Sequence, residues 1–299
     1  MKLAIVIPYY KKTFFRETMD SIASQTCKDF LLYVGDDASP ENPQDIIDEY
    51  KDKINIVYKR FDENIGGKDL VAQWERCIDL TEGEDWLWLF SDDDTMENTC
   101  VDEFYDVINN NESVQILRYS KRYNNIITGE SWRTDYKKGC GTVSDFLLDV
   151  LNLTPNHVTM PEFAYRRSLY NKLGFVKLPL AWGSDKATYL EYVCNVGGLY
   201  NMSSCINYRF SDENISSKED VAILKIKSDA DMLYEKHLVV LFRKISKNYP
   251  QINLSDLIDR RVTRYKTLPF RVRMFVVRNL LHAAKGSRDI KNVVKVLVG

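Results

Sequence analysis

The sequence predicts an α/β fold in which helices flank a mostly parallel central sheet. Strand-like and helix-like patterns alternate from Leu3 to Phe90. The first and last strands of this stretch, Leu3–Ile7 and Trp86–Phe90, are continuous apolar runs. Such runs are typical of parallel strands that are buried on both faces. Two of the strands end in acidic turns, and sheets of this kind bind ligands at the carboxyl ends of their strands.

The elements of the first half follow one another in a regular order. Parallel strands are joined through helices by right-handed crossovers, and the pattern fits that arrangement. Between the two apolar runs we predict a helix over Thr13–Gln25 with Thr13 as its N-cap, a strand over Phe30–Val34, a helix over Pro43–Tyr50, a strand over Ile54–Tyr58 and a helix over Gly66–Leu80.

The second half is less regular. Its predicted strands are Val114–Tyr119, Leu199–Met202 and Cys205–Phe210. Its predicted helices are Val143–Leu151, Arg167–Leu173 closed by Gly174, Asp185–Val196, a long helix from Ser217 to about Lys247 with Ser217 and Asp220 in capping-box-like positions, and a helix from about Phe270 to Ala284.

The composition fits one large domain or two smaller ones. The chain has 299 residues, and 44% of them are hydrophobic, which is enough for a packed core. We expect no membrane-spanning helix and no signal peptide, because the apolar runs are too short. Six cysteines without a C-x-x-C pair indicate reduced thiols and a cytosolic protein. Three widely separated histidines argue against a histidine-based zinc site.

Three consecutive carboxylates, Asp92–Asp94, follow the apolar strand that ends at Phe90. Their mutual repulsion costs free energy unless a cation or a set of hydrogen-bond donors compensates it. Carboxylate oxygens suit Mg²⁺ or Mn²⁺, which often bind one or two carboxylates together with substrate phosphates. The alternative is a solvated turn, and the presence of a second acidic turn at the same sheet edge favours the cation site.

Two further turns are candidates for nucleotide binding. In the turn Asp36–Ser39, one carboxylate could accept a hydrogen bond from a uracil-like imide N–H, although Asp and Ser are also ordinary turn residues. Gly66 and Gly67 allow close backbone approach, and Lys68 could face a base or a phosphate. A helix N-terminus explains the glycines nearly as well.

A series of short motifs runs through residues 1–216 in a defined order. They are Ile5-Val6-Ile7-Pro8-Tyr9-Tyr10, Ser24-Gln25-Thr26, Asp36-Asp37-Ala38-Ser39, Asn64-Ile65-Gly66-Gly67, Leu89-Phe90-Ser91-Asp92-Asp93-Asp94, Tyr165–Phe175, Gly183-Ser184-Asp185, Tyr208-Arg209 and Asn214-Ile215-Ser216. In their order and spacing these motifs resemble a family 2 glycosyltransferase.

The resemblance implies a GT-A fold, a nucleotide-diphosphate-sugar donor, Mn²⁺ or Mg²⁺ as cofactor, and inversion of the anomeric centre. It also implies that the segment from Pro8 to Tyr10 and the carboxylate of Asp37 lie against the base. Lys68 is a further candidate for that contact.

The resemblance places the acidic triplet at the ribose and the diphosphate of the donor. Asp92 would contact the ribose, Asp93 would ligate the metal, and Asp94 is a second metal candidate. Ser91 stands where the family commonly has another Asp, which is why the two roles fall on Asp92 and Asp93. Arg209 could contact the diphosphate, or could simply cover a surface.

Asp185 falls where the family keeps its general base. A carboxylate there would take the proton of the acceptor hydroxyl. Asp185 could also cap its own helix, and the two roles can coexist. Ser184 replaces the Glu of a common Glu-Asp pair. No histidine follows Tyr208-Arg209 closely, so we predict no histidine ligand.

Residues 260–299 differ from the rest in charge. They contain eleven Lys or Arg and one acid, which gives +10, whereas the rest carries −12. A helix over 270–284 would place four apolar residues in one stripe: Phe270, Met274, Val277 and Leu281. The stripe would either pack on the catalytic domain or lie on an anionic membrane surface. The acidic body argues against nucleic-acid binding.

Together these observations predict an inverting, metal-dependent glycosyltransferase that uses a nucleotide sugar, most simply a UDP-sugar. Its acceptor would be a glycan or lipid-linked hydroxyl in surface polysaccharide synthesis, at the inner membrane face. We expect a catalytic domain over 1–216 and a helical extension over 217–299. One alternative, a nucleotidyltransferase-like enzyme, needs a Gly-rich loop where this chain has Tyr9–Lys12. The other is a non-catalytic binding or scaffold protein.

Overall fold

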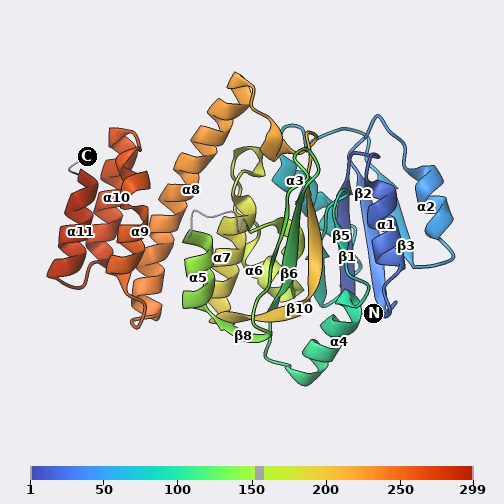
Figure 1. Cartoon of the computed structure of the whole chain (residues 1–299), viewed down its shortest axis with the longest axis horizontal. Coiled ribbons are helices and arrows are strands. Elements are labelled where there is room, and N and C mark those ends of the chain that lie inside the picture. Colours follow the sequence, from blue (N-terminus) through green and yellow to red (C-terminus); the bar gives the residue numbers. More distant parts are fainter. Residues whose placement is uncertain (1, 152–157, 298–299) are drawn as a thin grey trace.

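The computed structural model describes residues 2–151 and 158–297. A central sheet carries helices on both faces, and a group of C-terminal helices extends from one side of it (Figure 1). We call these helices the C-terminal arm: α8 Val221–Asn248, α9 Leu254–Lys266, α10 Phe270–Ala283 and α11 Ser287–Leu297. Met1 and the last two residues of the predicted basic segment lie outside the described residues.

The strands of the first half form the parallel arrangement that the sequence predicts. The sheet order is β3-β2-β1-β4-β9-β6-β10-β5. Its parallel start consists of β1 Leu3–Tyr9, β2 Phe30–Asp36, β3 Ile56–Arg60 and β4 Trp86–Leu89. The acidic turns after β2 and β4 therefore lie at the same edge of the sheet, as expected.

The second half of the sheet is mixed. β9 Phe163–Arg166 runs antiparallel between β4 and β6 Ile116–Asn125, and β10 Gly198–Phe210 is parallel to β6. β10 unites the two predicted strands, and its register with β6 shifts between Asn201 and Cys205. Three short strands pair antiparallel with β10 or β6: β5 Thr95–Met96, β7 Ser131–Thr134 and β8 Gly139–Thr142.

Helices cover both faces of the sheet, each with its own apolar core. One core contains side chains of α1 Phe15–Ala23, α2 Gln44–Tyr50 and α4 Cys100–Asn110. The other contains side chains of α3 Leu70–Ile78, α5 Val143–Leu151, α6 Arg167–Leu173 and α7 Ser184–Val196. Short 3-10 turns lie at η1 Met160–Glu162, η2 Pro179–Ala181 and η3 Ile215–Ser217.

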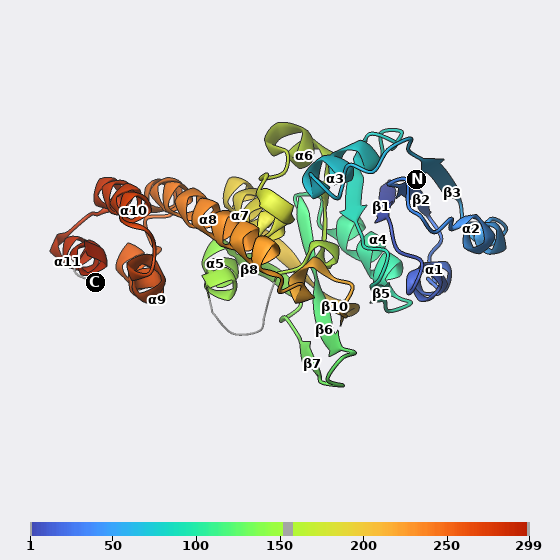
Figure 2. The same cartoon turned by 90° about the horizontal axis from the view of Figure 1, so that it is seen from above.

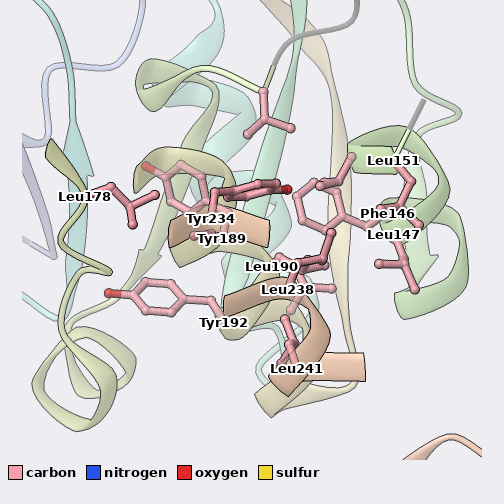
Figure 3. Packing of buried hydrophobic residues seen from close by; sticks show 14 of the residues in the cluster. Phe146, Leu147, Leu151, Leu178, Tyr189, Leu190, Tyr192, Tyr234, Leu238 and Leu241 are labelled. Carbon is pink, nitrogen blue, oxygen red and sulfur yellow. The ribbon is translucent and has the colours of Figure 1, made fainter. Parts of the chain in front are cut away.

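The long helix α8 joins the second core to the other three helices of the C-terminal arm. Tyr234 and Leu238 of α8 pack among Phe146 of α5 and Tyr189 and Leu190 of α7 (Figure 3). Seen from above, α8 leads from the sheet out to α9, α10 and α11 (Figure 2). The arm is thus packed against the sheet domain mainly through α8, with a smaller contact between α9 and α5.

Two predicted N-caps are wrong, and the helix predicted from Gly66 begins instead at Leu70 as α3, with Asp69 as its N-cap. α1 begins after Phe14, which caps it without a side-chain bond, and the Thr13 hydroxyl donates instead to Glu213 Oε1 at 2.8 Å. The N-cap of α8 is Asp220, whose carboxylate accepts from the N–H of Ile223 at 3.0 Å. Ser217 belongs to the preceding 3-10 turn. In both cases the hydroxyl bonds elsewhere, so the sequence pattern misplaces the cap.

The predicted apolar stripe of α10 is not its packed face. Val272, Val276 and Leu280 are buried, and α10 packs on α8 and α11. Of the four stripe residues, Val277 is buried, whereas Phe270, Met274 and Leu281 are 66%, 42% and 46% exposed. α10 therefore has apolar side chains on two faces. Among the described residues, no helix is both long enough and apolar enough to cross a bilayer.

Candidate active site

A cleft of about 870 Å³ runs along the carboxyl ends of β1, β2 and β4 and continues to α7 and the C-terminal arm. All nine residues predicted for the site fall within the described part of the chain. Seven of them line the cleft: Pro8, Tyr10, Asp37, Asp92, Asp93, Asp94 and Asp185. The other two, Lys68 and Arg209, do not.

Asp37 organises the glycine loop at one end of the cleft. Its Oδ1 accepts from the N–H of Ile65 at 2.9 Å and its Oδ2 accepts from that of Gly66 at 2.8 Å. Arg76 forms an ion pair with the same carboxylate, and Asp37 is only 3% exposed. The protein thus occupies both oxygens of Asp37, and Gly66 and Gly67 present their backbone to the cleft.

Lys68 and Arg209 point elsewhere. Lys68 is exposed on the surface beside the glycine loop, outside the cleft lining. The Arg209 guanidinium forms an ion pair with Glu17 and lies 4.1 Å from the ring centre of Phe14. Its backbone N–H, by contrast, supports the acidic triplet.

Asp92 fixes the end of β1. Its Oδ2 accepts hydrogen bonds from the backbone N–H groups of Tyr10 and Lys11, both at 2.8 Å. Desolvation and the neighbouring charge of Asp93 raise the pKa of Asp92 to about 7. The Lys11 ammonium opposes this shift and is held by the carbonyl oxygen of Glu213 at 2.5 Å.

Asp93 and Asp94 have different surroundings. Asp94 is 1% exposed, and its two oxygens accept from the Ser91 hydroxyl at 2.5 Å and the Arg209 N–H at 2.7 Å. Asp93 Oδ2 accepts from the Asn214 amide at 3.1 Å. Burial raises the pKa of both carboxyls. Asp94 is therefore built into the protein, and Asp93 is the carboxylate with fewer protein partners.

The donor set fits a hard cation held mainly by substrate phosphates. Within the described residues, no three His, Cys, Asp or Glu side chains form a complete metal cage. Mg²⁺ and Mn²⁺ do not need one, because one or two carboxylates with phosphate and water oxygens suffice. Desolvated, mutually repelling carboxylates in one cleft are the environment that a cation would stabilise.

Asp185 lies in the first turn of α7, after Gly183, which caps the helix with φ 81°. Its Oδ1 accepts from the Lys186 N–H at 2.7 Å. Desolvation in the cleft raises the pKa of Asp185 to about 6, against the opposing charge of Lys186. The buried Glu162 raises it further and Lys121 lowers it. A carboxyl with this pKa is ionised at neutral pH and is more basic than an ordinary Asp.

Residues 4–174 match the family described as glycosyl transferase family 2. The chain belongs to glycosyl transferase family 2. It is therefore a glycosyltransferase, and this membership excludes the nucleotidyltransferase alternative and favours an enzyme over a scaffold. A comparison with curated proteins gives no match.

Solved structures of S. aureus TarS share the fold. The fragment 1–349 in complex with UDP-GlcNAc is 17% identical, with a TM-score of 0.60, and the match covers 99% of this chain and 90% of that one. The same fragment in complex with UDP has a TM-score of 0.56 at the same identity and coverage. This likeness confirms the predicted GT-A fold with a helical C-terminal extension.

Several cleft residues of this family 2 member are missing from the sequence prediction. Lys11 and Asn214 contact the acidic triplet, and the only sequence signal for them is their place beside Tyr10 and in the motif Asn214-Ile215-Ser216. Others follow η2 or belong to the C-terminal arm, where no local pattern marks them: Trp182, Asp231, Tyr234, Glu235, Arg261 and Arg264. Their place in the cleft depends on how α8 and α9 pack.

Proposed function

We propose that this glycosyltransferase is an inverting, metal-dependent enzyme that transfers a sugar from a UDP-sugar to a hydroxyl of a glycan or lipid-linked acceptor. The observation that carries the proposal is that Asp93 and Asp185 line one cleft, the first at the end of β4 and the second at the start of α7. The complexes of S. aureus TarS with UDP-GlcNAc and UDP support a uridine nucleotide as donor.

The donor would lie along the carboxyl ends of β1, β2 and β4. Pro8, Tyr10 and the glycine loop held by Asp37 would border the base, and Asp92 would approach the ribose. Lys68 and Arg209 keep a role only if their side chains turn toward the nucleotide. Asp93, with Asp94 behind it, would hold Mn²⁺ or Mg²⁺ against the diphosphate. The ion would neutralise charge on the leaving group.

Asp185 would act as the general base. As the acceptor oxygen bonds to the anomeric carbon, the bond from that carbon to the diphosphate oxygen breaks, and the nucleoside diphosphate leaves with the electron pair. The carboxylate of Asp185 takes the hydroxyl proton. A single displacement of this kind inverts the anomeric centre, and it needs no covalent enzyme intermediate.

The two parts of the chain would divide the work. We propose residues 1–216 as the catalytic domain and 217–299 as an extension that positions it at the inner face of a membrane. Support comes from α10 and α11, whose outward apolar side chains Phe270, Met274 and Ile290 are at least 42% exposed within a segment of +10 charge. Such a surface suits anionic lipid. Surface polysaccharide synthesis on a lipid-linked acceptor is the setting that this location favours.

Calorimetric titration tests the proposal. UDP-GlcNAc, UDP, GDP, dTDP and CMP should be titrated into the full chain with and without Mn²⁺. The proposal expects binding of the uridine nucleotides that strengthens with Mn²⁺ and is lost in Asp93→Ala. Equal binding in the presence and absence of Mn²⁺, or an unchanged Asp93→Ala variant, contradicts the metal assignment. Absence of any nucleotide binding contradicts the function.

A further inference from the structure

The end of the cleft beside Asp185 is formed by residues outside the matched family region 4–174. Trp182 follows η2, Tyr234 and Glu235 lie on α8, and Arg261 and Arg264 lie on α9. The matched region ends before all of them. This part of the cleft therefore lies outside the region that matches the family, and the C-terminal arm supplies most of it.

Polar atoms in this part of the cleft lack partners within the protein. The Tyr234 hydroxyl, Arg261 Nε and Glu235 Oε2 are buried without a hydrogen bond. The three residues are 9%, 6% and 1% exposed. Buried polar atoms are nearly always paired, with protein, water or ligand. All three side chains line the cleft, and each still has one polar atom with an unmade hydrogen bond.

An aromatic ring of fixed orientation borders these atoms. Trp182 Nε1 donates to Asp231 Oδ1 at 3.0 Å, and Asp231 Oδ2 accepts from Arg264 at 2.8 Å. The Lys227 ammonium lies 4.6 Å from the centre of the Trp182 ring. The hydrogen bond to Asp231 fixes the edge of the indole ring, so a side chain of the C-terminal arm sets the orientation of Trp182.

The two arginines that line this part of the cleft have carboxylate partners. Arg261 pairs with Glu235 and Arg264 pairs with Asp231. The nearby Lys227 ammonium donates to the carbonyl oxygens of Ser216 and Lys218. Side chains of mixed donor and acceptor character next to an aromatic ring suit a sugar, whose hydroxyls both donate and accept and whose C–H faces pack on rings.

This region also contacts the start of α7. A Cβ placed at Gly183 would lie 3.5 Å from the Tyr234 ring, so the turn that carries Asp185 packs directly on Tyr234. A sugar bound over Trp182 and Tyr234 would bring a hydroxyl near Asp185.

We propose that Trp182, Tyr234, Glu235, Arg261 and Arg264 form the acceptor subsite, which binds an uncharged, hydroxyl-rich sugar unit. The proposal rests on the proposed function, because it takes Asp185 as the base that receives the acceptor's proton. It makes the C-terminal arm, rather than the region shared with the family, the determinant of acceptor choice.

Two variants test the subsite without removing the buried Arg261–Glu235 pair. Tyr234→Phe deletes one unpaired hydroxyl and keeps the ring, and Arg264→Ala breaks the ion pair at the rim. Lys266→Ala is the matched control, because Lys266 is an exposed residue of the same helix α9 and lies outside the cleft lining. Circular dichroism melts of all three verify folding.

The probes are neutral oligosaccharides, tri- to hexasaccharides of GlcNAc, glucose, galactose and rhamnose, with glucose 6-phosphate as the anionic comparison. Binding is measured by saturation-transfer NMR with the full chain saturated with UDP and Mn²⁺. We expect at least one neutral glycan to bind, with affinity about tenfold lower in Tyr234→Phe and Arg264→Ala and unchanged in Lys266→Ala.

The outcomes separate this subsite from the donor site. Unchanged glycan binding in both variants, binding of glucose 6-phosphate alone, or binding of no glycan by a wild-type chain that binds UDP overturns the acceptor subsite. Loss of UDP binding by the wild-type chain contradicts the proposed function instead.

Discussion

Gly66 and Asp37 meet in a contact that leaves no room for a side chain. The Gly66 N–H donates to Asp37 Oδ2 at 2.8 Å, and a Cβ at Gly66 would lie 2.5 Å from that oxygen. Asp37 is also tied to Ile65 and Arg76. The glycine loop is thereby fixed to the end of β2, where we place the nucleotide base.

Gly66→Ala should therefore destabilise the loop and weaken donor binding. The methyl group must displace the Asp37 carboxylate, which costs about 1–3 kcal/mol by overpacking. Gly286→Ala is the matched control, since nothing lies within 4 Å of a Cβ there. Urea unfolding and UDP titration measure the two effects. A Gly66→Ala variant as stable as Gly286→Ala would refute the contact.

Asp94 should have a structural role, whereas the neighbouring Asp93 should have a role in binding. Asp94→Ala leaves the Ser91 hydroxyl and the Arg209 N–H without their buried acceptor, and each unpaired group costs about 1–3 kcal/mol. Asp93→Ala removes one bond with Asn214 and the attraction of Lys11 and Arg209, and in exchange relieves the repulsion between Asp93 and Asp92. We expect a lower melting temperature for Asp94→Ala, and for Asp93→Ala near-normal stability with lost Mn²⁺-dependent UDP binding. A lower melting temperature for Asp93→Ala and lost Mn²⁺-dependent UDP binding only in Asp94→Ala would contradict this assignment.

Asp185→Asn should abolish transfer and increase stability at pH 7. The pKa of Asp185 is about 6 in the folded chain, above its ordinary 3.8. The folded state binds the proton more tightly, so this group's contribution to stability falls as pH rises from about 4 to about 6. At pH 7 the ionised carboxylate costs about 3 kcal/mol, which Asn avoids. Melting curves at pH 5 and pH 8 measure this. A variant that loses stability at pH 8 would contradict it.

The same pKa predicts the acid limit of the wild-type reaction. Asp185 must be ionised to accept a proton, so the rate with saturating donor should fall about tenfold per pH unit below about 6. Stopped assays of UDP release between pH 4.5 and 8 give the profile. A rate that is constant down to pH 5 would place the base elsewhere.

The predictable parts of the chain are those governed by local pattern. The strands β2 and β4 are apolar runs followed by acidic turns, and Asp37, Asp92 and Asp185 line the cleft as expected. Lys68 does not, because a long exposed side chain beside a glycine loop has no pattern that fixes its direction. Tyr234 lines the cleft, and its helical spacing predicts a core residue equally well.

Contacts between residues far apart in the sequence explain the remaining differences between prediction and structure. β10 was predicted as two strands because the polar segment Ser203–Ser204 interrupts it, yet Glu103 of α4 accepts hydrogen bonds from both N–H groups. The apolar stripe of α10 was assigned from one helix alone. Residues 270–284 carry a second apolar row, Val272, Val276 and Leu280, and packing on α8 and α11 decides which row is buried.

The exposed face of α10 should mediate membrane binding. Removing 260–299 would not test this, since it deletes Arg261 from the cleft and Val276 and Leu280 from the core. The double variant Phe270→Ser/Met274→Ser changes two exposed side chains and leaves that packing intact. Partial burial of two such side chains in lipid is worth about tenfold or more in affinity.

Flotation with vesicles of phosphatidylglycerol and phosphatidylcholine measures the effect. The wild-type chain should bind the anionic vesicles, less so at high salt because the attraction of the basic residues is screened, and the double variant should bind about tenfold more weakly. Val221→Ser is the control, because Val221 is 85% exposed at the start of α8, outside the basic segment. If the double variant and Val221→Ser bind the vesicles equally well, the exposed apolar side chains of α10 do not mediate membrane binding.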